Sequence, residues 1–564
     1  MPIISIKDLS FKYKKGHKEA LSNINLDIER GEMLAVMGST GAGKSTLCAT
    51  LNGLIPHLIR GDLNGNVWVS GMETRKVPVF ELSKIVGLVF QDFESQIFST
   101  NVELEVAFGL ENYGISPEDM HTRIASALAT TGLSGLESRE PSTLSGGEKQ
   151  RLAIASIIAM RPHVICLDEP TTDLDPQGRN GVLRIAKGLR REGSSLIIVG
   201  HEAEEILGSD KLLLMMDGRI MGYGKAEEIL KKPELLKDAG VMPPQTTELF
   251  SEAGEEERPV TIGEAERLIG IKGWRFAADI LDQKDTKNRN GYGDTIVEIR
   301  GISHIYDKGA AAIEDISLTI RMGEFLAILG HNGSGKTTLI KEINGLLTPQ
   351  KGDIYIEGAD AKRLGIEGIS KKVGYVFQNP DHQIFCERVY EEVAFGLRPL
   401  SLTHQEEKRR VEEALLAVGL QDKEDEDPFI LTKGERQRIA VASVLSRRPS
   451  LLILDEPTTG LDYKDIIGMM ELLKRLNEKG HTIIIVTHSM WVAAEYAKRI
   501  AIMSRGRIVM DNTPREIFSK DRELEALSLR APEITRLSRR FGFTVLSIKE
   551  FIETIYGRGE EEGR

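Results

Sequence analysis

Gly-Ser-Thr-Gly-Ala-Gly-Lys-Ser, at residues 38–45, is the stretch that decides the fold of this chain. It fits the pattern G-x-x-x-x-G-K-[ST] and lies between an apolar run at 33–37 and a helix-like run at 46–51. Its glycines allow the backbone to bend so that successive N–H groups point inward, and the following helix adds its positive N-terminal end. A concave surface of this kind suits a polyphosphate. The alternative, for the pattern taken alone, is a glycine turn before an ordinary helix.

The same pattern returns at residues 330–337, Gly-His-Asn-Gly-Ser-Gly-Lys-Thr, again after an apolar run. Lys336 follows Lys44 by 292 residues, and four later landmarks repeat at an offset of 287 residues. These landmarks are Gln91 and Gln378, Leu144 and Leu431, Asp168 and Asp455, and His201 and His488. The chain is therefore an internal duplication with one phosphate-binding loop in each half.

The pattern also predicts what the loop residues do. Lys44 and Lys336 would reach the β- and γ-phosphates of a nucleotide, while the hydroxyls of Ser45 and Thr337 would hold Mg²⁺. The expected nucleotide contacts are Gly38, Ser39, Thr40, Gly41, Ala42, Gly43, Lys44, Ser45 and Thr46 in the first half, and Gly330, His331, Asn332, Gly333, Ser334, Gly335, Lys336, Thr337 and Thr338 in the second.

Length and composition narrow the class of protein. A chain of 564 residues holds two or more domains, and each half is long enough to bury a core. The three cysteines form no C-x-x-C pair, which argues against a disulfide framework or a zinc cluster and favours a reducing, intracellular setting. The sequence has the features of neither a signal peptide nor a membrane-spanning run. A net charge of −12 argues against general affinity for nucleic acid.

Strands and helices are expected to alternate in each half. Residues 3–13 and 21–28 alternate apolar and polar side chains, which predicts paired strands ahead of the first loop. The helical patterns at 102–136 and 389–419 predict a helical insertion in each half. Further apolar strands complete a largely parallel sheet, with ligands at the carboxyl ends of its strands.

Two carboxylates follow an apolar strand in each half, and together they indicate hydrolysis rather than binding alone. Asp168 and Asp455 can bind Mg²⁺, commonly through water. Glu169 and Glu456, the next residues, are placed to polarise a water molecule aimed at the γ-phosphate.

Glutamines and histidines recur at matching positions near these carboxylates. Gln91 and Gln378 could contact the metal and the attacking water, and they would sense whether a γ-phosphate is present. His201 and His488 could hydrogen-bond the γ-phosphate and orient the water. A single histidine of this kind would more often be structural, but two in the same context favour a catalytic role.

A tyrosine precedes each loop by about 25 residues. Tyr13 and Tyr306 could therefore stack on an adenine ring. The alternative is a strand tyrosine that packs at the edge of a sheet.

Residues 144–148, Leu-Ser-Gly-Gly-Glu, open another predicted helix. A serine hydroxyl and glycine amides at a helix N-terminus form a second phosphate-binding surface, which is most useful to a nucleotide held by the other half. With these motifs in this order, nearly all of both halves resembles the ABC ATPase family. The resemblance implies an α/β fold with two P-loop NTPase domains, each with a mostly parallel sheet, an antiparallel β subdomain and an inserted helical subdomain. It also implies ATP and Mg²⁺, with two ATP molecules between head-to-tail halves.

We call residues 144–148 and 431–435 the signature segments. Their expected nucleotide contacts are Ser145, Gly146 and Gly147 in the first half, and Thr432, Lys433 and Gly434 in the second. In the implied pairing, each signature segment completes the site of the other half. Lys433 departs from the family pattern, because it stands where glycine is usual, restricts the backbone and brings a cation near the phosphates. We therefore expect unequal sites, with the site of Lys336 closer to the consensus.

The sequence also predicts where the domains divide. The predicted parts are a first ABC ATPase domain at 1–243, a helical extension at 244–280, a polar, turn-rich linker at 281–294, a second ABC ATPase domain at 295–529 and a helical C-terminal extension at 530–564. The last extension is expected to contain helices at 532–541 and 548–556. A linker this short favours pairing of the halves within one chain.

Residues 91–96 and 378–383, each followed by a Glu-Val-Ala-Phe-Gly-Leu segment, are similar to the ATPases of energy-coupling factor importers. The resemblance implies a membrane scaffold protein and a substrate-binding membrane protein for vitamins, vitamin precursors or transition metals. It places the chain at the cytoplasmic face of the cell membrane. Glu94 and Asp381 would face arginines on the scaffold's coupling helices, and the alternative is an exposed acidic loop without a partner.

A different function for a tandem ABC ATPase is action on ribosomes or nucleic acid, without transport. A protein of the ribosome-acting kind would be expected to carry a long, charged helical arm between its halves. The turn-rich stretch at 281–294 lacks that pattern, so transport is the favoured function.

Overall fold

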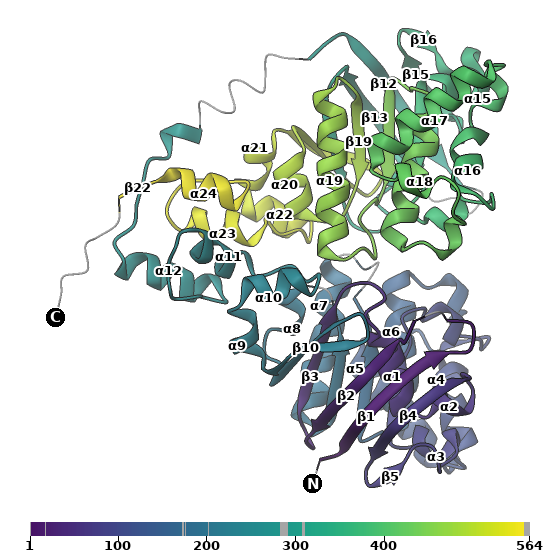
Figure 1. Cartoon of the computed structure of the whole chain (residues 1–564), viewed down its shortest axis with the longest axis vertical. Coiled ribbons are helices and arrows are strands. Elements are labelled where there is room, and N and C mark those ends of the chain that lie inside the picture. The colour runs from purple at the N-terminus through teal and green to yellow at the C-terminus, as the bar shows by residue number, and fades with distance from the viewer. Residues whose placement is uncertain are drawn as a thin grey trace. The chain divides into compact units, whose positions relative to one another are not determined.

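The computed structural model describes residues 2–16, 18–171, 174, 176–200, 202–281, 292–306 and 311–557. The chain divides into two compact units, Met1–Thr247 and Glu248–Arg564, which we call the first and second unit (Figure 1). Each unit contains a mostly parallel six-stranded sheet and a four-stranded antiparallel sheet. The predicted fold class is confirmed.

The six-stranded sheet of the first unit has the strand order β10-β9-β3-β8-β7-β6, and only β10 runs antiparallel to its neighbour. Its strands are β3 (Met33–Gly38), β6 (Val86–Val89), β7 (Val164–Asp168), β8 (Ser195–Val199), β9 (Lys211–Met216) and β10 (Arg219–Lys225). The strands β3, β7 and β8 are buried along their whole length, as expected for parallel strands covered on both faces. Because β3 and β7 both run parallel to β8, which lies between them, the loops after β3 and β7 open at the same edge of the sheet.

The antiparallel sheet of the first unit alternates buried and exposed residues, which fits one packed and one solvated face. Its strands are β1 (Ile4–Tyr13), β2 (Leu21–Ile28), β4 (Gly61–Val69) and β5 (Met72–Glu73). It shares one hydrophobic cluster with β3 and with the helix α1 (Lys44–Leu51) that follows the phosphate loop. The core of this unit therefore lies directly beneath the loop.

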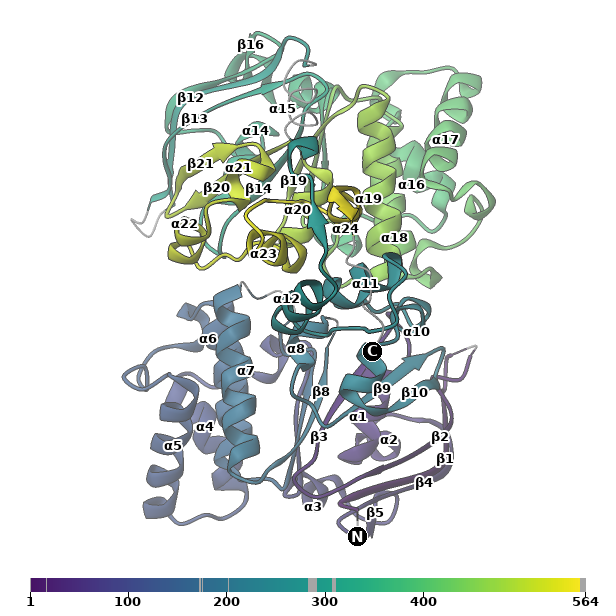
Figure 2. The same cartoon turned by 90° about the vertical axis from the view of Figure 1, so that its left-hand side faces the viewer.

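The predicted helical insertion of the first unit forms two helices, α4 (Val102–Asn112) and α5 (Pro117–Thr131). They pack with α6 (Gly146–Ala159) in a separate cluster beside the sheet (Figure 2). Asn101 and Ser116 cap α4 and α5 by accepting hydrogen bonds from backbone N–H groups of the first turn. The remaining helices of this unit are α2 (Leu54–His57), α3 (Val79–Ser83), α7 (Pro176–Arg191), α8 (Ala203–Ile206), α9 (Ala226–Leu230) and α10 (Pro233–Asp238).

The second unit repeats both sheets, with the orders β17-β18-β19-β14-β20-β21 and β13-β12-β15-β16. The strands are β12 (Thr295–Ile305), β13 (Ala311–Arg321), β14 (Phe325–Leu329), β15 (Lys351–Ile356), β16 (Ala359–Asp360), β17 (Val373–Val376), β18 (Leu451–Asp455), β19 (Thr482–Val486), β20 (Arg499–Ser504) and β21 (Arg507–Asn512). The helices that match those of the first unit are α14 (Lys336–Ile343), α15 (Ala361–Lys372), α16 (Val389–Phe395), α17 (His404–Val418), α18 (Lys433–Leu445), α19 (Tyr463–Glu478) and α20 (Met490–Tyr496).

The extension that follows the first ATPase half packs inside the second unit. Helices α11 (Gln245–Glu252) and α12 (Ile262–Ile271) share a hydrophobic cluster with α23 (Glu533–Arg539) and α24 (Ile548–Thr554) near the end of the chain (Figure 1). The rings of Phe250 and Trp274 stack with centroids 5.0 Å apart. The rings of Phe276 and Phe551 meet edge to face at 5.5 Å. The two extensions are thus one structural element, and the helices just before it, α21 (Pro514–Phe518) and α22 (Asp521–Ala526), pack in the core of the second unit.

The prediction that the last helix spans residues 548–556 is wrong at its C-terminal end. Helix α24 stops at Thr554, and β22 (Ile555–Gly557) pairs antiparallel with β11 (Arg275–Phe276). A β-branched residue and an aromatic residue, Ile555 and Tyr556, favour a strand once a partner strand is available. The predicted linker lies largely outside the described residues.

Among the described residues, no helix is both long and apolar enough to cross a membrane.

The shared cluster of the two extensions predicts a stability effect. Phe551 is fully buried in it, so Phe551→Ala should lower the free energy of unfolding of the second unit by about 3–5 kcal/mol. Tyr556→Ala is the matched control, because its ring is 67% exposed and its loss should cost less than about 0.5 kcal/mol. Denaturant unfolding followed by tryptophan fluorescence measures both, and equal costs would contradict this packing.

Candidate functional site

The phosphate loop of the first unit leaves the sheet at Gly38, where no other residue fits. Gly38 has φ of +152°, and a Cβ there would overlap the carbonyl oxygen of Met215 on the neighbouring strand β9. Gly43, the residue before α1, has φ of +96°, and a Cβ there would overlap the carbonyl oxygen of Ala20. Both positions require glycine for conformation and for space.

The loop lysines are already held inside their own loops. Lys44 Nζ donates hydrogen bonds to the carbonyl oxygens of Gly38 and Ser39, at 2.9 and 3.0 Å. Lys336 Nζ makes the same two contacts within its loop, at 2.8 and 3.0 Å. Both side chains are buried, so each ammonium is preorganised at the centre of the curved backbone. Ser45 and Thr337, the next residues, are exposed at the first turn of their helices.

In the first unit, the predicted base contacts the predicted sensor residue. Gln91 Nε2 donates a hydrogen bond of 2.7 Å to Glu169 Oε2, and the other carboxylate oxygen lies 3.9 Å from Lys44 Nζ. Asp168 and Glu169 are buried where β7 ends. The structure therefore brings lysine, glutamine and carboxylate together. His201 lies outside the described residues, so its role stays a prediction.

In the second unit, the predicted base, Glu456, contacts the predicted histidine, His488. Nδ1 of His488 lies 2.9 Å from Glu456 Oε2, and Thr459 Oγ1 donates to the same oxygen at 2.9 Å. The preceding carboxylate, Asp455, accepts a hydrogen bond of 3.1 Å from the hydroxyl of Tyr375. The sequence reasoning missed Thr459 and Tyr375. The position of Thr459, three residues after Glu456, could have indicated its contact with that carboxylate. Nothing in the sequence indicated the contact of Tyr375 with Asp455.

The two carboxylates of the second unit have well-separated pKa values. Burial and the adjacent Glu456 charge raise the pKa of Asp455 to about 6. Burial acts in the same direction on Glu456, but His488 and the hydrogen bond from Thr459 outweigh it and lower the pKa of Glu456 to about 2. Glu456 is therefore ionised at neutral pH, as a group that polarises water must be.

The two predicted stacking tyrosines are tied to the helices after the loops. The hydroxyl of Tyr13 hydrogen-bonds Thr46 Oγ1 at 2.9 Å, and the hydroxyl of Tyr306 hydrogen-bonds Thr338 Oγ1 at 3.3 Å. Both rings are more than one third exposed. An aromatic face is therefore available beside each loop, although Tyr13 also packs against Phe11 within its sheet.

Both signature segments form capping boxes at the start of α6 and α18. Ser145 Oγ accepts from the Glu148 backbone, and the Glu148 carboxylate accepts from the Ser145 N–H. Thr432 and Glu435 repeat these bonds. Both hydroxyls are exposed.

The glycines of the signature segments are not equivalent. A Cβ at Gly434 would lie 2.6 Å from Asp465 Oδ1, so this glycine is needed for space. A Cβ at Gly146 would meet no atom within 4 Å, and one at Gly147 would meet only atoms 3.9 Å away. Among the described residues, neither glycine of the first signature segment is therefore needed for space.

The residues predicted to hold Mg²⁺ have a suitable donor set. They are hydroxyl, carboxylate and amide oxygens, the hard ligands that Mg²⁺ prefers: Ser45, Gln91 and Asp168 in the first unit, and Thr337, Gln378 and Asp455 in the second. Within the described residues, no group of three or more His, Cys, Asp or Glu side chains could form a separate metal site. Bound Mg²⁺ would supply charge neutralisation at the β- and γ-phosphates.

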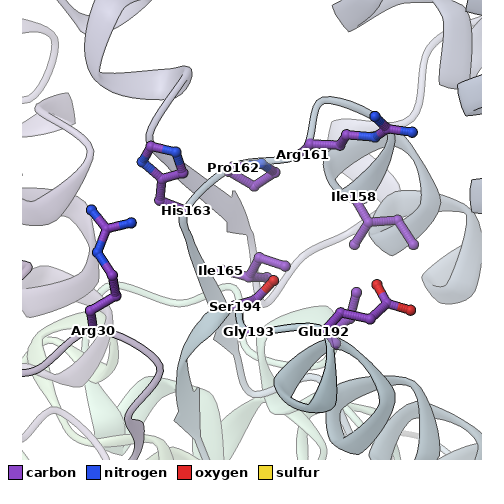
Figure 3. A pocket seen from close by; sticks show the side chains of 10 residues that line it. Arg30, Ile158, Arg161, Pro162, His163, Ile165, Glu192, Gly193 and Ser194 are labelled. Carbon is purple, nitrogen blue, oxygen red and sulfur yellow. The ribbon is translucent and has the colours of Figure 1, made fainter.

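A pocket of about 300 Å³ lies at the opposite edge of the first unit's sheet, before β7 and β8 begin (Figure 3). Its rim carries Arg30, Arg161, His163 and Glu192. Figure 3 shows Arg30 and Arg161 on opposite sides of the pocket, so their charges do not converge. This pocket is separate from the phosphate loop.

The fold and these residues define a tandem nucleotide-binding ATPase. Lysine and backbone amides can bind phosphates, and an ionised glutamate can polarise a water molecule. The family profile described as ABC transporter matches residues 21–172 and 313–459. The chain belongs to the ABC transporter family of ATP-binding proteins, a membership that implies ATP binding and hydrolysis.

Several relatives match over almost their whole length. One from Caldanaerobacter subterraneus subsp. tengcongensis, named "Putative ABC transporter ATP-binding protein", is 49% identical over 97% of this chain and 98% of its own. A Methanosarcina acetivorans protein with the same name is 38% identical over 98% of this chain and 94% of its own. The structure of cbiO1 from Clostridium perfringens, described as part of the ABC transporter complex cbiONQ, is 35% identical over 44% of this chain and 99% of its own, with a TM-score of 0.39.

The lysine at position 433 predicts unequal hydrolysis at the two sites. Glu456→Gln should remove most of the ATPase activity, because Glu456 belongs to the site of Lys336, the site closer to the consensus. Glu169→Gln should remove the smaller share. Phosphate release at saturating ATP measures both rates, and equal losses would contradict the prediction.

Proposed function

We propose that this chain hydrolyses ATP to drive uptake of a small solute, a vitamin, vitamin precursor or transition metal, through a separate membrane scaffold. The observation that carries the proposal is that each unit has a pair of exposed phenylalanines, beside residues 91–96 in the first unit and beside residues 378–383 in the second. Exposed apolar groups that recur in this way indicate a protein interaction surface.

The exposed aromatic pairs have the same geometry in both units. Phe98 and Phe108 meet edge to face with centroids 4.6 Å apart, and Phe385 and Phe395 do the same at 4.6 Å. Their side chains are 61%, 46%, 57% and 40% exposed, in that order. Leaving these rings in water has a cost that a partner surface would remove.

A buried glutamate holds each pair in place. Glu105 Oε2 accepts hydrogen bonds from the backbone N–H groups of Phe98 and Ser99, at 3.1 and 2.8 Å. Glu392 makes the equivalent two contacts in the second unit, both at 3.0 Å. These glutamates begin the two Glu-Val-Ala-Phe-Gly-Leu segments, so that repeated sequence presents rigid apolar groups for docking.

The acidic residues expected to bind the scaffold are ion-paired within their own units. Glu94 lies 2.7 Å from Lys149, and Asp381 lies 2.7 Å from Arg436. Lys149 and Arg436 belong to α6 and α18, the helices that begin within the signature segments. Exposed ion pairs contribute little to stability, so an arginine of the scaffold can replace Lys149 or Arg436 as the partner of the acidic residue. Docking would then act directly on the signature helices.

In the proposed cycle, each phosphate loop binds one ATP, and the signature segment of the other half completes the site. The γ-phosphate contacts exist only in the closed state, so hydrolysis and release would reopen the halves. The chain would work at the cytoplasmic face of the membrane, bound to the scaffold and a substrate-binding membrane protein.

Charge reversal tests the docking surface. Glu94→Lys together with Asp381→Lys should abolish co-purification with a detergent-solubilised membrane scaffold, because the exchangeable acids are lost. ATP affinity should stay unchanged. Asp62→Lys with Glu525→Lys, which reverses two exposed acidic residues elsewhere, is the control and should leave co-purification intact. Retained co-purification of the Glu94 and Asp381 variant, or co-sedimentation of the chain with ribosomes instead, would contradict the proposal.

A further inference from the structure

Lys433, the lysine in the second signature segment, lies against the loop that follows the catalytic carboxylates of its own unit. A Cβ added at Gly460 in that loop would overlap Nζ of Lys433 and lie 3.5 Å from its Cε and 3.9 Å from its Cδ. Gly460 has φ of +68°, a conformation that favours glycine. The lysine side chain therefore fills the space that a side chain at position 460 would need.

The first unit carries the opposite combination at the matching positions. At the offset of 287 residues, Lys433 corresponds to Gly146 and Gly460 corresponds to Asp173. A Cβ at Gly146 would meet no atom of the described residues within 4 Å, and Asp173 lies outside those residues. Lysine and glycine in the second unit are thus a matched pair, in which the glycine leaves room for the lysine.

The contact is made by the end of the lysine side chain. The atom nearest to the space beside Gly460 is Nζ, and Cε and Cδ lie farther from it. The side chain is half-buried, and a lysine whose end lies against a glycine backbone restricts both partners.

Gly460 is covalently next to a residue that holds the catalytic base. Thr459 Oγ1 donates to Glu456 Oε2 at 2.9 Å, the same oxygen that His488 contacts. The backbone of Thr459 also donates to the Glu456 carbonyl oxygen, at 3.2 Å. A restraint on Gly460 therefore acts on Thr459 and, through it, on the Glu456 carboxylate.

We propose that Lys433 is a positioning residue that connects the second signature segment to Glu456 through Gly460 and Thr459. The inference rests on the proposed pairing of the halves, in which this segment contacts the ATP held by Lys44 while Glu456 acts on the ATP held by Lys336. Lys433 then makes hydrolysis at one site depend on nucleotide at the other. Because the first signature segment has glycine at position 146, the coupling runs in one direction.

The test uses the full chain in a Glu169→Gln background, where turnover comes from the site of Glu456. Adding Lys433→Gly should lower kcat about tenfold with little change in KM for ATP, because the base loses its support while the phosphate loop stays intact. Adding Lys433→Met should restore part of the activity, since its unbranched side chain, one atom shorter than lysine, reaches as far over Gly460 as the Cε of lysine. If Lys433→Gly only damaged the fold, it would also lower the melting temperature. Recovery of activity in Lys433→Met would exclude a role for the positive charge of Lys433.

The same substitution in a Glu456→Gln background tests the alternative that Lys433 is a phosphate ligand. A loss found there, with no loss in the Glu169→Gln background, would overturn the inference, as would failure of methionine to rescue. If the Glu169→Gln protein hydrolyses ATP too slowly to measure, backbone amide hydrogen exchange of residues 458–461 tests the inference instead. Lys433→Gly should accelerate exchange and Lys433→Met should not, whereas unchanged exchange would overturn the inference. None of these measurements involves a membrane partner, so failure of the uptake proposal leaves their result interpretable.

Discussion

Both nucleotide loops depend on a close backbone approach that only glycine permits. Gly38 begins its loop against the carbonyl oxygen of Met215, and Gly330 does so against the carbonyl oxygen of Met503, in each case on the neighbouring strand. A side chain at either position would push the end of the central strand away from the sheet. The two carbonyl contacts that hold each loop lysine would then be lost. Sheet packing and phosphate binding are therefore inseparable here.

Around this shared framework, the two units differ in sequence at positions that leave the fold unchanged. Lys433 in the second signature segment stands where the first has Gly146. The core beneath the loops has changed as well. The thiols of Cys48 and Cys166 in the first unit occupy positions where the second unit has isoleucines.

These two thiols pack as core residues. A hydrogen bond with Cys166 and burial raise the pKa of the Cys48 thiol, so this buried group stays neutral. The apolar character of the core is thus kept at both positions, although the residues differ. The functional divergence of the units lies at the surface of the site, above all at Lys433.

Much of this arrangement could be predicted from the sequence, because it depends on local pattern. The glycines and lysine at 38–45 predicted a strand, a phosphate-binding turn and a helix, and the structure places them so. The 287-residue offset predicted that the second unit repeats the first, which the two sheet orders confirm.

Contacts between side chains that lie far apart in the chain could not be predicted from the sequence. The sequence predicted helical extensions at 244–280 and 530–564, but not that α11 and α12 would share a hydrophobic cluster with α23 and α24. The ion pair of Glu94 with Lys149, and the packing of Lys433 on Gly460, join residues brought together only by the fold. A single sequence holds no record of such distances.

The most direct test of the account is a structure of the Glu169→Gln, Glu456→Gln protein trapped with Mg²⁺ and ATP. The account predicts two ATP molecules, with Ser145 Oγ at a hydrogen-bond distance of about 2.7–3.2 Å from the triphosphate held by Lys336. Nucleotide contacted by one half alone, with Ser145 facing solvent, would contradict it.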